Sequence, residues 1–392
     1  MLAIAGCATA PTEYHAPAAL GAGERAALNL RVFERAWELV DEKYFDAQFR
    51  GVDWPAMREK HRPEAVAAQD DEALYQALNR LAAELKESHL RAISPRRDHE
   101  RSAGQRAAVG MRWQMLEGRR VIADVVPGGA AAIAGVQRGW FVLTRNGTPL
   151  REGDPYVPKL GEPVTYGFLD ENETPRTLTM EPRLISFARQ EEQGLPGGFI
   201  YLRFDEFSRE NLSWLSGRLK AHSAAPGVVI DLRENHGGNA LALNVAVAEF
   251  FSKRVAEGRL IRRGGREREA NSLSWRSARY AGRVAILTGP VTGSAAEIFA
   301  HVLQHHRRAV VIGRRTAGAV IYSRYYPLPG GGRLQIPVSD YLGLDGKRLE
   351  GRGVAPDIAV PAATAADFRA NRDADLAAAL QELTRSQNPS AD

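Results

Sequence analysis

The chain has 392 residues, which is enough for about two or three domains of ordinary size. Its 44% hydrophobic and 25% charged residues are typical of a globular protein with a buried core. The net charge of +5 is spread without a run of like charges, and no apolar run reaches the roughly 18 residues of a membrane span. Composition therefore argues against a nucleic-acid-binding protein and an integral membrane protein. The single cysteine excludes a disulfide framework and a multi-cysteine metal site.

The first residues, 1–23, predict a signal remnant or a lipoprotein tether. Cys7 follows the small pair Ala5-Gly6 and precedes an Ala- and Pro-rich stretch, a pattern that resembles the lipobox of bacterial lipoprotein precursors. Cys7 is therefore the predicted lipidation site of a periplasmic protein in the cell envelope, with possible lipid-anchored membrane association. The apolar run before it is short and carries no Lys or Arg. This leaves two alternatives, a start upstream of Met1 or a cytoplasmic protein in which Cys7 is incidental.

Residues 24–98 predict a helical N-terminal domain. Apolar residues recur at spacings of three and four in two groups, which are Leu30, Phe33, Trp37 and Val40, then Leu74, Leu78, Leu81 and Leu85. Asp53-Trp54 opens another short helix between them. Pro95 and the charged stretch to Arg106 predict a linker.

Residues 104–185 change to short strands and turns. A strand, a Pro-Gly turn, a short Ala-rich helix and a glycine-led strand follow in that order, which resembles a PDZ domain, here expected as a small β-barrel. A PDZ-like fold binds an extended chain end by adding it as a strand. The resemblance assigns the carboxylate-cradling amides to the loop at Val109, Gly110 and Met111. The alternative is a spacer barrel whose groove is blocked, and an open and an autoinhibitory groove both remain possible.

Residues 186–365 alternate strands with helices, which predicts an α/β core with a buried sheet. Residues 366–392 predict a helical and then disordered tail. The fold class is therefore a multidomain α+β or α/β protein with a helical N-terminal unit, a PDZ-like barrel and an α/β core.

Ser294 follows a strand and opens a helix in Thr292-Gly293-Ser294-Ala295-Ala296-Glu297. The amides at a helix N-terminus can stabilise the oxyanion of an acyl-transfer intermediate. Serine is also a common N-cap, so the motif alone is weak.

Several further motifs occur in a fixed order along the chain, and together they are more specific than the serine motif alone. They are Asp231-Leu232-Arg233-Glu234-Asn235-His236-Gly237-Gly238, Thr316-Ala317-Gly318, Gly330-Gly331-Gly332 and Glu350-Gly351-Arg352-Gly353. This series resembles the tail-specific or C-terminal-processing serine proteases of family S41, over about residues 28–360. The resemblance implies a crotonase-like α/β protease core, peptide or unstructured protein substrates, and no cofactor or metal.

The sequence departs from that family at the general base. The processing proteases carry a lysine about 25 residues after the serine, where this chain has Ala319. Only seven of the 52 basic residues are lysines, and none lies between Lys253 and Lys347. A Ser–Lys dyad is therefore not expected, and histidine is the default base near neutral pH, with activity rising through pH 6–7.

The tricorn-like branch of the family supplies a histidine and a glutamate at matching positions. The resemblance assigns Ser294 as nucleophile, His89 as general base and acid, and Glu350 as the group that orients the imidazole. Ser88 is expected to bridge the same network. Amides of Ala295 and of the Gly237-Gly238 pair would form the oxyanion hole, with the donating glycine left open.

Three alternatives accompany this assignment. His236 in the glycine loop is a rival base. A catalytically inactive S41-like scaffold that binds peptides or other ligands would keep the fold without hydrolysis, and a hydrolase acting on a non-peptide acyl substrate would keep the chemistry. His301 and His305 are spaced i, i+4, but Arg307-Arg308 beside them favours a solvated helix surface over a metal site.

Overall fold

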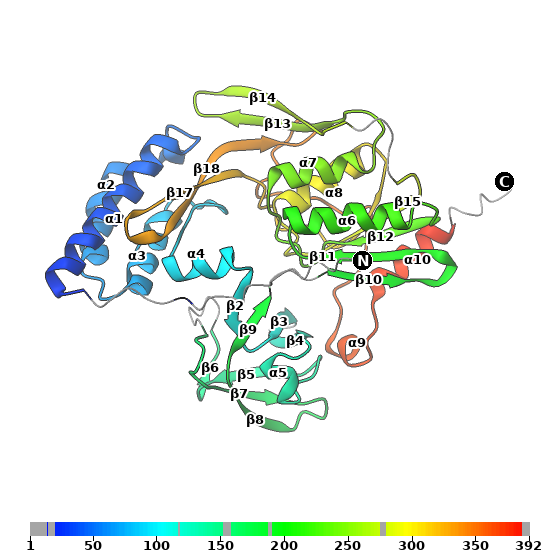
Figure 1. The fold of residues 1–392 in the computed structure, drawn as a ribbon, viewed down its shortest axis with the longest axis horizontal. Helices are drawn as coiled ribbons and strands as arrows, with labels where there is room; N and C mark the ends of the chain where they lie inside the picture. The colour runs from blue at the N-terminus through cyan, green and yellow to red at the C-terminus, as the bar shows by residue number, and fades with distance from the viewer. Residues whose placement is uncertain are drawn as a thin grey trace, which may run out of the picture.

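The computed structural model describes Tyr14 and residues 20–116, 118–151, 158–186, 190–274 and 280–385. Cys7 and the final residues 386–392 lie outside the described parts, and with them the predicted lipidation site. The protein is a mixed α/β molecule of several units, which confirms the predicted fold class (Figure 1). None of the helices in the described ranges combines the length and apolar character needed to cross a membrane.

The N-terminal unit consists of three helices, α1 (Ala22–Lys43), α2 (Trp54–Val66) and α3 (Asp71–Ala83). Asp53 and Asp70 cap α2 and α3 by accepting backbone N–H groups of the first turns. The helices bury their apolar stripes together, and the same cluster contains Leu328, Leu334 and Ile336 from much later in the chain. This unit is therefore not closed on itself.

Those late residues belong to a five-stranded antiparallel sheet that lies between the helices and the core. Its strands are β1 (Arg91–Ile93), β13 (Ala256–Arg262), β14 (Arg266–Asn271), β17 (Tyr322–Pro327) and β18 (Arg333–Leu342). The order is β1-β18-β13-β14, and β17 also pairs with β18. Figure 1 shows β17 and β18 running from the blue helices to the α/β core.

The predicted linker contains a helix, α4 (Pro95–Ser102). Ser94 accepts the Arg97 N–H, Pro95 occupies the first turn, and Asp98 places a negative charge near the N-terminus. These start signals were readable in the sequence, but the segment has no apolar stripe. α4 leads into β2 (Gln105–Ala108), which pairs with β9 (Arg183–Ser186), so that both connections to the next unit run side by side.

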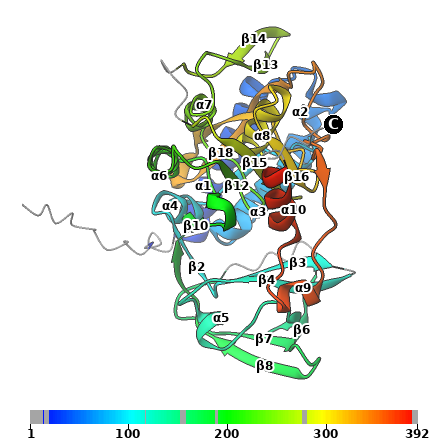
Figure 2. The ribbon, with the colours of Figure 1, turned by 90° about the vertical axis from the view of Figure 1, so that its right-hand side faces the viewer.

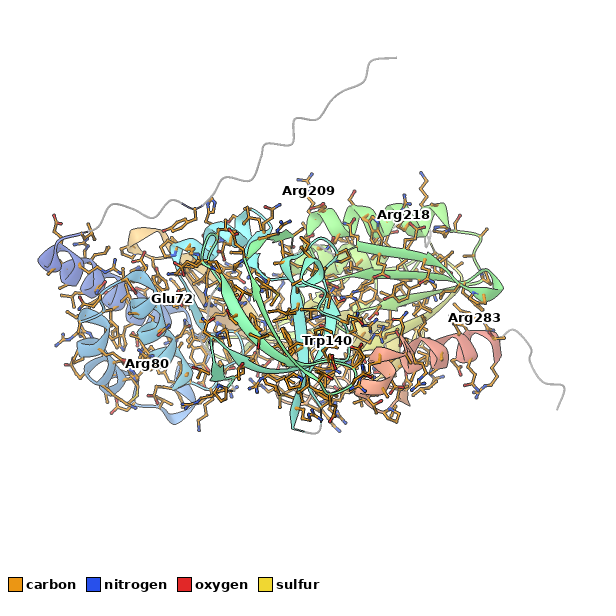
Figure 3. All side chains as sticks on the ribbon, turned by 90° about the horizontal axis from the view of Figure 1, so that it is seen from below. Glu72, Arg80, Trp140, Arg209, Arg218 and Arg283 are labelled. Atoms are coloured by element: carbon orange, nitrogen blue, oxygen red, sulfur yellow. The ribbon has the colours of Figure 1, made fainter. Side chains whose placement is uncertain are left out.

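The unit reached by this pair, residues 105–186, is called the β-domain here. A sheet of order β3-β4-β5-β7-β8, with β6 on β5, packs around Trp140, Phe168 and the short helix α5 (Ala130–Ile133). The strands are β3 (Met111–Leu116), β4 (Arg119–Val125), β5 (Phe141–Arg145), β6 (Thr148–Pro149), β7 (Val164–Leu169) and β8 (Pro175–Met180). Among the described strands, the two edge strands β3 and β8 do not pair with each other, so the sheet does not close into a barrel. Figure 1 shows the β-domain below the helices and the core, and Figure 3 looks at it from that side, with Trp140 near its centre.

The core sheet has the order β10-β11-β12-β15-β16-β19 and is parallel except at β10. Its strands are β10 (Gln190–Gly194), β11 (Ile200–Phe204), β12 (Gly227–Asp231), β15 (Arg283–Thr288), β16 (Val310–Gly313) and β19 (Ile358–Ala359). Helices α6 (Arg209–Ala221), α7 (Ala240–Ala248) and α8 (Ala295–His305) pack on one face. The carboxyl ends of β12 and β15 therefore open into neighbouring loops, where α/β proteins place their sites.

The chain end packs on the other face of the core sheet. Helix α10 (Ala374–Arg385) contributes Ala379 and Leu383 to the cluster on that face. The short helix α9 (Ala365–Arg369) reaches the β-domain, where Arg138 donates to the Asn371 side chain at 2.6 Å. Figure 2 shows α9 beside the β-domain and α10 against the core. The last segment thus contacts both units.

His301 on α8 is buried, with 8% of its surface exposed, so the predicted solvated helix surface is wrong at this residue. Its Nε2 accepts the Leu344 N–H at 3.0 Å. Burial is the main cause that lowers the pKa of His301 to about 4. Within the described ranges, no group of three or more His, Cys, Asp or Glu side chains is arranged to hold a metal ion.

His301 should make stability depend on pH. Unfolding returns its pKa from about 4 to the ordinary value near 6.5, so its contribution is intact above pH 6.5 and is lost as the pH falls toward 4. We expect a loss of about 2–3 kcal/mol over this window. His301→Gln keeps an acceptor without a titrating proton and should flatten the dependence of the urea midpoint on pH. His305→Gln on the exposed side of α8 is the matched control, and an equal flattening there would contradict the prediction.

Candidate active site

Ser294 occupies a strained position at the N-terminus of α8. Its backbone has φ 54° and ψ −122°, a conformation that costs a non-glycine residue about 1–3 kcal/mol. Hydrogen bonds hold it there, because the Ser294 N–H points to the Ala319 carbonyl at 2.7 Å and to Glu297 Oε2 at 3.1 Å. The nucleophile predicted from the sequence therefore lies on a sharp turn between β15 and a largely buried helix.

The glycine loop, residues 232–239, lies directly against this turn. A Cβ on Gly237 would lie 2.5 Å from the Ser294 Cβ, and one on Gly238 would lie 2.4 Å from the Phe207 carbonyl oxygen. Both glycines have positive φ, +97° and +146°. Only glycine permits this backbone and this approach. The loop therefore brings its main chain, rather than side chains, next to Ser294.

Asn235 fixes the loop from below. It is fully buried, its Nδ2 donates to the Phe204 carbonyl at 2.9 Å, and its Oδ1 accepts the Gly237 N–H at 2.9 Å. The Gly237 amide is thereby used inside the loop. Within the described chain the Gly238 and Ala295 N–H groups have no acceptor, so these two amides are free to bind a developing oxyanion.

Glu297 organises the turn around Ser294. Its carboxylate is fully buried and accepts from the Thr316 hydroxyl, from the Gly318 and Ala319 N–H groups at 2.7 and 2.8 Å, and from the Ser294 N–H. Burial raises the pKa of Glu297, and these donors oppose the rise. The sequence analysis did not assign Glu297 a role, although the Ser-x-x-Glu spacing of a capping box was a usable signal.

Glu297→Gln should disturb both stability and the nucleophile. An amide presents two donors where the carboxylate meets four donors, so some of these bonds are lost or repelled. We expect a destabilisation of about 2–4 kcal/mol and a lower rate of covalent labelling at Ser294. Urea unfolding and fluorophosphonate labelling measure the two effects. Glu38→Gln on the exposed face of α1 is the control, and wild-type stability in Glu297→Gln would refute the argument.

His89 lies in the turn between α3 and β1, next to Ser88. The Ser88 hydroxyl and the His89 Nδ1 form a hydrogen bond of 2.7 Å, which leaves Nε2 for another partner. Burial lowers the pKa of His89 to about 4, while the Glu350 charge raises it and the Arg91 charge lowers it further. The imidazole is therefore neutral near pH 7, as a general base must be.

Glu350 is joined to Ser294 through the segment 318–320. The Ala319 carbonyl accepts from Ser294, and the next residue, Val320, donates its N–H to Glu350 Oε2 at 2.5 Å. Gly351 donates its N–H to the Gly318 carbonyl at 2.7 Å. A cleft of about 510 Å³ borders Glu350 and Ser88, with the lining Arg50, Ala83, Lys86, Glu87, Ser88, Gly318, Arg348, Glu350 and Gly351.

The structure brings some predicted site residues together and leaves one contact open. Ser88 bonds to His89, and the charge of Glu350 acts on the same imidazole. Within the described chain, the Ser294 hydroxyl is not hydrogen-bonded to His89 or to His236. The His236 carbonyl lies next to Gly293, and burial lowers the pKa of its imidazole. His236 thus also stays close to the nucleophile.

Ala319, at the position of the family's lysine, is a backbone junction. Its N–H donates to Glu297 and its carbonyl accepts from Ser294, so the main chain of this residue positions the predicted nucleophile. Its side chain is a methyl group and supplies no base. The arrangement of a serine at a helix N-terminus, free amides and an uncharged imidazole suits acyl transfer.

Comparison with known proteins shows which family the chain resembles. Residues 198–360 match the sequence profile of peptidase family S41, and residues 29–83 match the tricorn protease C1 domain. The protein is therefore a serine-type peptidase. The match to the S41 family covers the segment that carries Ser294 and Glu350.

Relatives and solved structures cover most of the chain. A carboxyl-terminal-processing protease of Synechocystis sp. is 25% identical over 94% of this chain and 89% of its own length. Tricorn protease homolog 1 of Streptomyces coelicolor is 26% identical over 94% of this chain but only 37% of its own length. The photosystem II D1 C-terminal processing protease superposes with a TM-score of 0.60, at 21% identity over 85% of this chain and 93% of that one. Mature CPAF bound to lactacystin gives 0.65, at 14% identity over 92% and 98%.

Proposed function

We propose that this chain is a serine endopeptidase in which Ser294 is the nucleophile and His89 the general base and acid. Glu350 orients and stabilises the imidazolium, and Ser88 holds Nδ1. One observation carries the proposal: Ser294 lies in a strained turn, and the nearby backbone N–H groups of Gly238 and Ala295 have no hydrogen-bond acceptor in the described chain. An N-cap serine of purely structural use requires neither the strain nor the free donors.

The reaction follows from these groups. The Ser294 hydroxyl attacks the peptide carbonyl carbon while His89 Nε2 takes its proton, and the oxyanion is held by the Gly238 and Ala295 N–H groups. The imidazolium then gives its proton to the leaving amine, which breaks the C–N bond. Water, deprotonated by His89, then attacks the acyl carbon; the bond between this carbon and the Ser294 oxygen breaks, His89 returns the proton to that oxygen, and the carboxylic acid product leaves. The contact between Ser294 and His89 forms on substrate binding, since catalytic hydrogen bonds are often absent without substrate.

The β-domain would dock the substrate chain in the manner of a PDZ domain. Supporting this, the carbonyls of Val109 and Gly110 are used by the Ala131 and Val126 N–H groups, at 2.7 and 2.8 Å. In the described chain the N–H groups of Val109 and Gly110 have no acceptor. Together with Met111 they form the proposed cradle for a chain end. A peptide that binds this loop should shift its amide resonances, which an NMR titration measures.

The β-domain is also tied to the glycine loop. Arg112 on β3 forms an ion pair with Glu234, and a second one with Asp124 at 3.1 Å. A substrate bound to the β-domain would therefore lie on a unit that contacts the glycine loop of the proposed oxyanion hole.

Membrane tethering through Cys7 is a separate proposal. Its support is the lipobox-like pattern of the first residues, which implies a periplasmic, lipid-anchored enzyme. Metabolic labelling with a radioactive fatty acid should mark the wild-type chain and not Cys7→Ser. An unlabelled wild-type chain would refute the anchor.

Covalent labelling separates the enzyme from its rival. The open contact between Ser294 and His89 favours a second candidate, an inactive S41-like scaffold that only binds peptides. A fluorophosphonate should modify Ser294 in the enzyme, and mass spectrometry of the digested protein identifies the residue. Absence of labelling together with peptide binding would support the scaffold. Faster turnover of simple esters than of any unstructured protein would support a non-peptide substrate.

A further inference from the structure

Arg91 is an exposed guanidinium at the start of β1, two residues after His89. Its neighbours in the strand, Ala92 and Ile93, are buried. Within the described residues, Arg91 forms no ion pair with a carboxylate. Arg112 and Arg203, by contrast, form ion pairs with Glu234 and Asp205.

A buried polar chain holds Arg91 in place. Arg91 pairs with Gln335 in the β1–β18 ladder, and its Nε donates to Gln335 Oε1 at 2.7 Å. Gln335 is only 3% exposed, and its Nε2 donates to the Ser323 hydroxyl at 2.7 Å. The hydrogen bond to Gln335 thus occupies the Nε of Arg91. The two terminal NH₂ groups of the guanidinium, which can bind a carboxylate, remain available.

The charge of Arg91 acts on both imidazoles of the site. Burial is the main cause of the lowered pKa at His89 and at His236, and Arg91 lowers the pKa further at both. Arg106 and Arg112 also act on His236, against Asp205. Asp205 is bound by Arg203 through two hydrogen bonds of 2.9 and 3.2 Å. Charges of both signs therefore act on the two histidines, with Glu350 raising the pKa of His89 and Asp205 that of His236. Arg91 is the arginine that acts on both, and its terminal NH₂ groups are unused in the described chain.

A folded protein gains little by fixing an unpaired cation in one direction with a buried amide. Exposed arginines that have no role are usually free to rotate, and fixing one loses side-chain entropy. A partner of opposite charge would recover that loss through charge-assisted hydrogen bonds. The place of Arg91 beside the general base restricts this partner to groups near the reacting bond.

We propose that Arg91 is a specificity-determining residue that binds a carboxylate of the peptide substrate close to the scissile bond. The inference rests on the proposed peptidase function. The carboxylate can come from an internal Asp or Glu side chain or from the C-terminus of the substrate, because both present the same two oxygens. In either case the enzyme prefers substrates that carry negative charge beside the cleaved bond.

The test uses one fluorogenic peptide sequence and the full-length enzyme. Single positions on each side of the cleaved bond are Gln, Glu or Lys in peptides with an amidated end. A second set is shortened so that the chain ends in a free carboxylate at each position after the bond. At one position, wild-type enzyme should cleave the carboxylate-bearing peptide with a kcat/KM about tenfold above that of its neutral counterpart. The two peptide sets distinguish the side-chain from the terminal source.

Arg91→Gln should remove this preference, and Arg91→Glu should reverse it in favour of Lys. Arg91→Lys keeps the charge without the fork and should retain part of the preference. Loss of Arg91 also raises the pKa of both histidines, but this effect cancels in the ratio of two kcat/KM values at one pH. The control is Arg80→Gln, which removes an arginine on α3 that is paired with Glu64 on α2; Figure 3 shows Arg80 among the N-terminal helices.

The outcomes separate the inference from the function on which it rests. Equal kcat/KM for all peptides, with Ser294→Ala inactive, overturns the role of Arg91 and leaves the peptidase. A carboxylate preference that survives in Arg91→Gln overturns it as well. Absence of cleavage of every peptide, or equal cleavage by Ser294→Ala, overturns the peptidase assignment itself.

Discussion

Ser294→Ala is expected to abolish peptide hydrolysis while the fold stays intact. The loss in kcat should be at least about 10⁴-fold, because the proposed acyl-enzyme forms on the Ser294 oxygen. The fold should persist because the Ser294 hydroxyl has no hydrogen bond in the described chain, and the bonds of its backbone N–H do not need the side chain. Turnover of an unstructured protein substrate and urea unfolding measure the two halves of the prediction.

The matched control is Ser213→Ala on the exposed face of α6. It removes the same hydroxyl from a solvent-facing helix and should leave both rate and stability unchanged. Hydrolysis by Ser294→Ala at the wild-type rate would show that the nucleophile lies elsewhere. Loss of activity with an unfolded protein would be separated from loss of chemistry by the unfolding curve.

His89→Ala is the second large effect, with an expected loss of about 10³–10⁴-fold in kcat. In the wild type, kcat/KM should stay level from neutral pH down to about pH 5 and fall through about pH 4, where His89 becomes protonated. This lies below the pH 6–7 that an ordinary histidine predicts, and burial is the reason. A series of kcat/KM values over the pH range in which the enzyme stays folded measures this dependence.

His236→Ala distinguishes the two imidazoles. It should retain most of the activity, since His236 is assigned no proton transfer. If His236→Ala were inactive and His89→Ala fully active, the base would be His236. An acid limb near pH 6.5 would contradict the buried, neutral state of His89.

Periodicity gave the helices of the N-terminal unit and the strand–helix alternation of the core, because their apolar faces are regular. It missed α4, whose residues are almost all charged or polar, and it missed β13 and β14. The residues of β14 are polar and mostly exposed, so its strand conformation depends on pairing with β13 rather than on an apolar pattern.

The candidate site divides in the same way. Ser294 could be proposed because it follows a strand and opens a helix, and the two glycines because a close backbone approach requires glycine. The capping-box spacing indicated a place for Glu297 at the start of the helix, but its long-range partners and those of Arg91 could not be predicted. Glu297 binds a segment about 20 residues away, and Arg91 depends on Gln335, 244 residues away. Only the folded chain shows what these side chains meet.

The shared core of the helices and the β17–β18 strands has a consequence for biosynthesis. Helices α1–α3 complete their apolar cluster with Leu328, Leu334 and Ile336, so the segment that carries His89 gains its packing only after β18 has left the ribosome. Ser294 lies before those strands in the chain. We therefore expect the proposed nucleophile and base to come together only after this late segment has been synthesised, so that the nascent chain is inactive until then.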